Sequence, residues 1–294
     1  MQRRRLFLPG VTIIVAAFST LLLARARSAD REEFPQGKDC PHDARQLYIP
    51  AGDFWMGSTK EEREYAYRLD KDATRAYGWY EKETRRKAKT GVFCIDRNPV
   101  TNLEYKKFID ETARTAPFIS SEAYQRQGFL VHPYENVKGF LWLNRSFPPG
   151  RKDHPVALVN LDDAKSYCAW MGKKLKRKYH LPTEAEWEKA ACGIDGRIFP
   201  WGNEWNPDYL NSGERIGSTT PVNRFPRGKS PYGVYDMVGN VFEWTASQWD
   251  DKNFVVKGCS WDDLPGTCRA AMRHGRPPQS KHILIGFRCV SDMD

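Results

Sequence analysis

The sequence predicts an α/β protein made of a single irregular domain with much loop. Short apolar segments typical of strands alternate along the chain with helical segments that carry capping residues. Two long stretches, 115–154 and 195–231, are rich in glycine, proline and aromatic residues and show no regular period. The chain has 10 Trp, 13 Tyr and 15 Phe but no Gly/Ser tract or Pro-rich hinge. We therefore expect one aromatic-rich domain over residues 47–294.

The first 26 residues have the pattern of a secretory signal peptide. Arg3, Arg4 and Arg5 precede an apolar run over 11–24, and Ala-Arg-Ala at 24–26 offers a cleavage site. The arginines fit a twin-arginine signal or a plain Sec signal, and both remain open. We expect an exported protein with an N-terminal segment at 27–46 and no stable membrane anchor after cleavage.

The charge distribution argues against a nucleic-acid partner. The formal net charge is +9, and cleavage after residue 26 removes four of the arginines. The densest basic run, 173–178, is typical of an exposed helix end rather than of a nucleic-acid-binding stripe.

The first half of the domain is expected to contain strands and helices of modest length. Residues 47–57 are interpreted as strand, turn and strand. Residues 60–89 are interpreted as one helix, because acids lie early and bases late, as the helix dipole favours. A short strand at 93–95 precedes a helix capped by Thr101. Residues 115–154 are expected to form a long loop layer.

The second half contains two more helices. Asp162 or Asp163 opens a helix that runs to Met171, and Thr183 with Glu186 forms a capping box that opens another. The last strands are expected at 255–256, 260–261 and 285–290.

The stretch 232–245, YGVYDMVGNVFEWT, has the residue types of a calcium site. Asp236, Asn240 and Glu243 place oxygen ligands close together, and the glycines at 233 and 239 permit sharp turns. The alternative is that Asp236 and Asn240 are turn residues and Glu243 is an exposed strand residue.

The seven cysteines all follow the predicted signal peptide. In an exported protein they can form disulfides, and an odd number leaves at least one thiol free or intermolecular. No C-x-x-C pair occurs, which argues against a thioredoxin-like or zinc-ribbon site. The sequence also shows no zinc triad, nucleophile elbow or phosphate loop.

Eight segments occur in an order that resembles the formylglycine-generating enzyme (sulfatase-modifying factor) family, from Leu47 to Val290. They are IPAGDFWMG, NPVTNLEYKKFI, HPVALVNLDDAKSYCAWMG, LPTEAEWEKAA, FPWGNEW, YGVYDMVGNVFEWT, KGCSW and IGFRCV. The resemblance implies a single loop-rich α/β domain of the formylglycine-generating-enzyme type, related to the C-type lectin fold. Residues 63–70 and the C-terminal stretch resemble an exported, periplasmic branch that includes a pyoverdine-maturation protein.

The resemblance implies two structural Ca²⁺ sites. The first would use the side chains of Asp236 and Glu243 and the carbonyls of Gly239 and Val241. We expect that only a bound cation offsets the charge of the two carboxylates. The second would use four residues of one loop: Asn211, Ser212, Glu214 and Ile216.

Copper is not expected, although oxidase members of the family use it. The resemblance implies that those enzymes hold Cu(I) between two thiolates and use dioxygen to convert a cysteine to formylglycine. The two positions here are Asp263 and Cys268. A carboxylate is a hard ligand and does not replace a thiolate for Cu(I), so we do not expect formylglycine generation.

The resemblance also implies a disulfide scheme with one buried free thiol. The scheme is Cys168 with Cys289, Cys192 with Cys268, Cys40 with Cys94, and Cys259 unpaired.

The family's active-site cleft would lie around Ser260. The candidate catalytic residues are Ser260, Trp261, Asp263, Arg273 and His274. Acids beside several arginines, here also Asp262, Arg269 and Arg276, can be simple ion pairs, or a general base with an anion-binding rim.

Two functions remain open on the sequence. The first is a periplasmic oxidative maturation or tailoring factor for a peptide-like substrate, such as a siderophore precursor. The second is a non-catalytic, calcium-stabilised binding or scaffold protein that has lost the copper chemistry.

Overall fold

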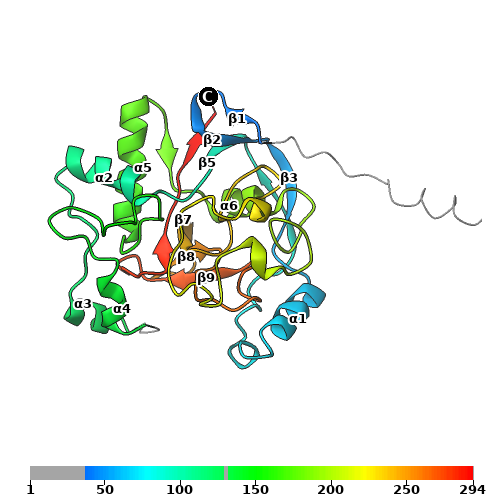
Figure 1. The fold of residues 1–294 in the computed structure, drawn as a ribbon. Coiled ribbons are helices and arrows are strands. Elements are labelled where there is room, and N and C mark those ends of the chain that lie inside the picture. Colours follow the sequence, from blue (N-terminus) through cyan, green and yellow to red (C-terminus); the bar gives the residue numbers. More distant parts are fainter. Residues whose placement is uncertain (1–36, 129–131, 294) are drawn as a thin grey trace, which may run out of the picture. The chain divides into compact units, whose positions relative to one another are not determined.

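Three β-sheets organise the described chain, which comprises residues 37–128 and 132–293 of a computed structural model (Figure 1). All described elements belong to one compact unit, Pro35–Asp294. The signal peptide predicted at 1–26 lies outside the described residues, as does the first part of the segment 27–46. Among the described helices, none combines the length and the apolar character needed to cross a bilayer.

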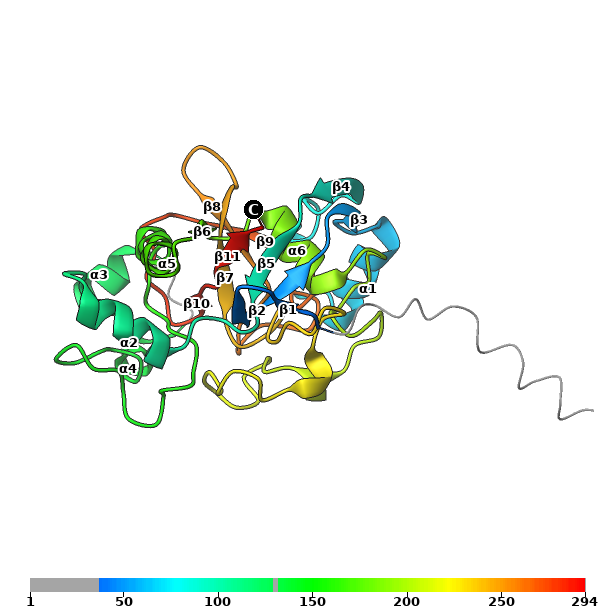
Figure 2. The same cartoon turned by 90° about the horizontal axis from the view of Figure 1, so that it is seen from above.

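The first sheet joins both ends of the described chain, with strand order β1-β2-β5-β11-β6 (Figure 2). Its strands are β1 (Asp39–Cys40), β2 (Asp43–Ile49), β5 (Phe93–Asp96), β11 (Val290–Asp292) and β6 (Tyr179–His180). The disulfides Cys40–Cys94 and Cys168–Cys289 stabilise this region, as predicted. The domain boundary expected after residue 46 falls inside β2.

The second sheet has the order β10-β7-β8-β9. Its strands are β10 (Ile285–Gly286), β7 (Phe242–Gln248), β8 (Phe254–Lys257) and β9 (Arg273–Arg276). In the β8–β9 pair, Val256 lies opposite His274 and Lys257 opposite Arg273. Because strand side chains alternate between two faces, Arg273 points to one face of β9, and His274 to the other.

The helix predicted over 60–89 is correct only in its first third. Helix α1 (Lys60–Leu69) has a capping box formed by Thr59 and Glu62. Lys71 and Asp72 then adopt positive φ angles, 52° and 62°, which end the helix. A short 3₁₀ helix, η1 (Arg75–Tyr77), follows. The chain then forms β4 (Arg86–Thr90), which pairs with β3 (Gly52–Met56) in the third sheet.

Three further helices begin at capping boxes; the sequence predicts the box at Thr183 and a cap at Thr101. They are α2 (Asn102–Glu111), α5 (Leu161–Leu175) and α6 (Glu184–Cys192). Thr101 and Thr183 cap α2 and α6. Asn160, not Asp162 or Asp163, caps α5, and Asp163 is its reciprocal partner.

The stretch predicted as loop over 115–154 contains two short helices, α3 (Ser121–Arg126) and α4 (Tyr134–Lys138). The region 195–231 contains only the 3₁₀ turns η2 (Pro207–Tyr209) and η3 (Pro226–Gly228) and is otherwise irregular, as predicted. Both views place α2, α3, α4 and α5 on one side of the sheets and α1 on the other (Figure 1 and Figure 2).

The predicted pairing of Cys192 with Cys268, and the free thiol at Cys259, are wrong. Cys259 is bonded to Cys268, and Cys192 is the free, buried cysteine of the described chain. Cys192 ends α6 in the core cluster around Phe54. Cys259 and Cys268 lie together in the larger cluster that packs against α2 and α5. Cys259 therefore pairs with Cys268 because both lie in the same core cluster, whereas Cys192 lies in the other one.

Candidate functional site

The segment after β8 forms a tight turn, not the strand predicted at 260–261. Gly258 takes a φ of 77°, and a Cβ there would lie 2.9 Å from the Met237 carbonyl oxygen, so the position favours glycine. Ser260 is fully buried. Its backbone N–H donates to Asp263 Oδ2 at 2.8 Å. Its hydroxyl lies 2.6 Å from Asp262 Oδ1 and also contacts Asp263 Oδ2.

Asp263 is the titratable centre of this turn. Burial, and then the neighbouring charge of Asp262, raise the pKa of Asp263 to about 7. The hydrogen bonds from Ser260 and the charge of Arg276 act in the opposite direction. A carboxyl with a pKa near neutrality can accept and return a proton at physiological pH.

Two other parts of the chain complete the site. His132 Nε2 lies 2.9 Å from Asp262 Oδ2, and the imidazole stacks on Trp261 with ring centroids 4.7 Å apart. The 211–216 loop approaches from another side, where Glu214 N donates to Trp261 O at 2.9 Å. We call Ser260, Trp261, Asp262, Asp263, His132 and Glu214 the Ser260 cluster.

Sequence reasoning found part of this cluster. Ser260, Trp261 and Asp263 lie together as predicted, with Asp262 beside them. His132 was missed because it is far away in sequence and carries no motif. No local sequence signal marks it: the Tyr124 hydroxyl donates to the His132 carbonyl at 2.9 Å and fixes its position, a contact that the sequence alone does not show.

Arg273 does not join the cluster. Its guanidinium donates to Glu184 Oε2 at 2.9 Å and stacks over Trp249. His274, on the opposite face of β9, packs between Trp79 and Phe242. Burial, and then the charge of Arg276, lower the pKa of His274 to about 3, so it stays neutral. The cation whose charge acts on Asp263 is that of Arg276.

Some acids and arginines near the turn are simple ion pairs. Arg269 donates to both carboxylate oxygens of Glu83, at 2.8 and 3.1 Å, and both residues are buried. Lys257, also buried, lies 2.7 Å from Glu188. Because Arg269 and Arg273 are paired with glutamates, Arg276 is the arginine of the 269–276 run whose charge acts on Asp263.

The two positions equivalent to the family's copper ligands do not fit Cu(I). Cys268 Sγ is bonded to Cys259, and the Asp263 carboxylate accepts hydrogen bonds from Ser260. A two-thiolate site needs two free sulfurs, and this arrangement offers neither.

Glu243, a predicted calcium ligand, is paired with Arg288. Arg288 Nε and Nη2 lie 2.7 Å from its two carboxylate oxygens, and Trp187 Nε1 donates at 2.7 Å. Both charged side chains are fully buried. The expectation that only a bound cation could offset the Glu243 charge is therefore wrong.

The remaining predicted calcium ligands belong to two segments of the chain, 211–216 and 236–241. Asp236 is buried, which raises its pKa to about 6, and Asn240 Nδ2 lies 3.5 Å from its carboxylate. Asn211 Nδ2 donates to Ser218 O, while Asn211 Oδ1 is buried without a partner among the described residues. Ser212 is buried, Ile216 is exposed, and the Gly239 carbonyl accepts from Val241 N at 2.9 Å.

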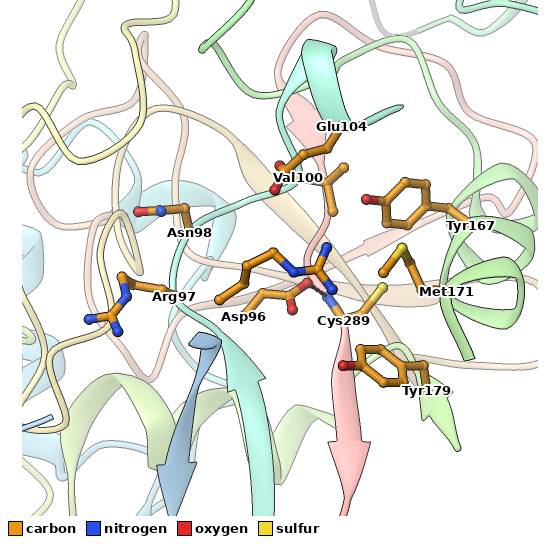
Figure 3. A pocket seen from close by; sticks show the side chains of 10 residues that line it. Asp96, Arg97, Asn98, Val100, Glu104, Tyr167, Met171, Tyr179 and Cys289 are labelled. Carbon is orange, nitrogen blue, oxygen red and sulfur yellow. Dashed lines mark hydrogen bonds between the residues drawn. The ribbon is translucent and has the colours of Figure 1, made fainter. Parts of the chain in front are cut away.

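A separate pocket of about 250 Å³ lies beside the first sheet (Figure 3). Figure 3 shows Tyr167 and Met171 from α5 and Tyr179 from β6 on one side, with Asp96 from β5 facing them. Burial raises the pKa of Asp96 to about 7, although Cys289 N and Gln46 Nε2 donate to it. No sequence pattern predicts this pocket, which shares no lining residue with the Ser260 cluster.

Comparison with known proteins shows the family. The model of the sulfatase-modifying factor enzyme 1-like domain matches residues 31–293, so the chain belongs to this family. It is 35% identical over 238 residues to the inactive C-alpha-formylglycine-generating enzyme 2 of Bos taurus, covering 68% of this chain and 77% of that protein. It is 30% identical over 311 residues to the formylglycine-generating enzyme of Bos taurus, covering 88% and 77%.

A further relative and two solved structures are also similar. Hercynine oxygenase of Mycolicibacterium smegmatis is 32% identical over 234 residues, which cover 68% of this chain and 53% of that protein. PvdO from Pseudomonas aeruginosa has the same fold, with a TM-score of 0.63, 24% identity, and coverage of 87% of this chain and 97% of its own. Treponema denticola variable protein 1 has a TM-score of 0.61 at 17% identity, covering 84% and 94%. These likenesses confirm the predicted family and fold class.

Proposed function

We propose that this protein is an exported oxidative tailoring factor that acts on a peptide-like substrate at the Ser260 cluster. The observation that carries the proposal is the half-buried Asp263 carboxyl, whose pKa is raised to about 7 and which contacts Ser260, whose hydroxyl also contacts Asp262. Family membership supports oxidation, because one relative is named as a hercynine oxygenase and another as a formylglycine-generating enzyme. A siderophore precursor is the substrate class we favour, from the resemblance to the exported pyoverdine-maturation branch.

The chemistry assigned to the protein is proton transfer during a two-electron oxidation. An electron-rich substrate group loses two electrons and two protons, and dioxygen accepts them as hydrogen peroxide. Asp263 takes one of the two protons from the substrate and passes it to the reduced dioxygen. Arg276 stabilises negative charge that develops on the substrate as the proton leaves.

Export to the periplasm agrees with the cysteine chemistry. Three disulfides among the described residues suit an oxidising compartment. The export itself rests on the sequence pattern of residues 1–26.

Structural calcium is part of the proposal. Asn211 Oδ1 is a buried oxygen without a partner among the described residues, and the buried Asp236 carboxylate is bonded to Asn240, which in turn lies 3.4 Å from Asn211. Unpaired oxygens and a buried carboxylate are stabilised by a hard cation.

A calcium-stabilised, non-catalytic binding protein is the second candidate. It is favoured by the Cys259–Cys268 disulfide and by Asp263, which together remove both copper thiolates. A relative at 35% identity is named as an inactive enzyme, which agrees with this reading.

Metabolite profiling of a deletion strain tests the two candidates. The tailoring function predicts that a precursor two hydrogens heavier than the final product accumulates in the deletion strain and disappears when the gene is restored. A deletion strain whose metabolites are all in their normal oxidation states would contradict the tailoring function and favour the binding protein.

A further inference from the structure

We propose that His132, Glu214 and Asp262 form a binding site for a divalent first-row transition metal ion of the Zn²⁺ or Co²⁺ kind. One ligand atom from each residue lies within 4.8 Å of the other two. The three residues come from the segment after α3, the 211–216 loop and the turn after β8. Neither the calcium sites nor the copper site expected from the family contains this set.

The distances fit a metal that these side chains can close around. His132 Nε2 and Asp262 Oδ2 are 2.9 Å apart. Two donors bound to one metal at about 2.0–2.1 Å each lie roughly 2.8–3.4 Å apart, from a right angle to a tetrahedral angle. The third ligand, Glu214, has an exposed side chain, so its carboxylate can complete the set by rotation about its own bonds.

The first two ligands are held in place by neighbouring groups. The Ser260 hydroxyl lies 2.6 Å from Asp262 Oδ1, which leaves Oδ2 directed at His132. Hydrogen bonds that orient a ligand from its outer side are a usual property of metal sites. The Trp261 ring fixes the His132 imidazole by stacking, with centroids 4.7 Å apart.

A second, independent observation is that the Trp261 side chain carries a buried N–H donor without an acceptor. Trp261 is only 2% exposed, and its Nε1–H has no hydrogen-bond partner among the described residues. Buried donors are rarely left without a partner, so an orphaned N–H calls for a missing acceptor such as a water or an anionic ligand. Trp261 stacks on His132, so the residue that carries this unpartnered donor is in contact with a proposed ligand.

The donor set selects the class of metal. One imidazole nitrogen with two carboxylates suits Zn²⁺, Co²⁺, Fe²⁺ or Mn²⁺. Ca²⁺ prefers oxygen ligands only, and Cu(I) prefers thiolates. The site also concentrates negative charge, because Asp262 and Asp263 are adjacent and Glu214 joins them. A divalent cation would offset this charge.

Titration with Co²⁺ tests the site, because its visible absorption reports the ligands directly. The purified mature protein, first stripped of metal, is titrated both without Ca²⁺ and in excess Ca²⁺, because Glu214 is also a residue of the second expected calcium site. We expect one Co²⁺ per chain, with an absorption band typical of mixed nitrogen and oxygen ligands. Glu214→Gln, at an exposed position, should weaken binding by about tenfold or more, and His132→Gln should abolish the band.

A matched control is His180→Gln. His180 Nε2 also lies 3.0 Å from an aspartate, Asp292, but among the described residues no third ligand completes that pair. It should leave Co²⁺ binding unchanged. Absence of binding in the wild type, or binding that persists in the Glu214→Gln, His132→Gln double variant, would overturn the proposal.

The test does not depend on the proposed function, because it needs no substrate. Asp263→Asn should keep Co²⁺ binding, since Asp263 is not one of the three ligands. The Co²⁺ titration therefore tests the metal site alone, and its failure can be told apart from failure of the tailoring function.

Discussion

At the scale of single residues, the raised pKa of Asp263 makes stability depend on pH. The folded state binds a proton on this carboxyl up to about pH 7, whereas the unfolded chain releases it near the ordinary aspartate pKa of 3.8. The contribution of the protonated Asp263 carboxyl to the free energy of unfolding is therefore fully present below pH 3.8. It is lost as pH rises through about 7.

Asp263→Asn should reduce this loss of stability. Asparagine keeps an acceptor for Ser260 N but carries no charge to bury, so we expect the free energy of unfolding at pH 8 to rise by about 1–2 kcal/mol relative to the wild type, with little change at pH 4. Urea unfolding at the two pH values measures this. Asp251→Asn, at an exposed aspartate, is the control. Equal pH dependence in wild type and Asp263→Asn would contradict the assignment of a raised pKa.

A second residue-scale prediction concerns the buried pair Arg288 and Glu243. Arg288→Met leaves an uncompensated buried carboxylate and should lower the free energy of unfolding by about 3–5 kcal/mol. Adding Glu243→Gln should restore part of this loss, because the unpaired charge is removed. Chemical denaturation of the two variants checks both steps. A loss below about 1 kcal/mol in the single variant would argue against the pair.

At the scale of elements, the disulfide scheme makes a direct prediction. The unfolded, unreduced protein should contain one thiol that reacts with Ellman reagent, and Cys192→Ala should remove it. Cys259→Ser should instead raise the count to two, because Cys268 loses its partner. A thiol count that is unchanged by Cys192→Ala would show that the pairing is different.

Elements governed by local chemistry could be predicted from the sequence, and elements governed by distant contacts could not. Thr101 and Thr183 cap their helices through bonds to residues three positions away, so sequence spacing is enough. The charged strand β4 has no apolar alternation, and only pairing with β3 makes it a strand. Sequence spacing alone therefore predicted one long helix there.

The candidate site follows the same division. Ser260, Trp261 and Asp263 are neighbours in sequence, so their grouping could be predicted. His132 enters the site because Tyr124 and Trp261 hold it there, and neither contact has a trace in local sequence. Arg273 was misplaced because the two faces of β9 cannot be assigned before its neighbours are known.

At the scale of the whole molecule, bound calcium should contribute to stability. Removal with a calcium-selective chelator should lower Tm by several degrees, because the unpartnered Asn211 Oδ1 and the buried Asp236 would lose their cation. Thermal unfolding with and without chelator, together with elemental analysis, measures this. An unchanged Tm and no bound calcium would contradict the proposal.

The measurement that tests the central claim most directly is complementation of the deletion strain by Asp263→Asn. If the Ser260 cluster performs proton transfer in an oxidation, this variant should fold and be exported, yet leave the unoxidised precursor accumulated. Asp251→Asn should restore the normal product. Full restoration by Asp263→Asn, at wild-type protein levels, would contradict the catalytic account and favour the binding-protein alternative.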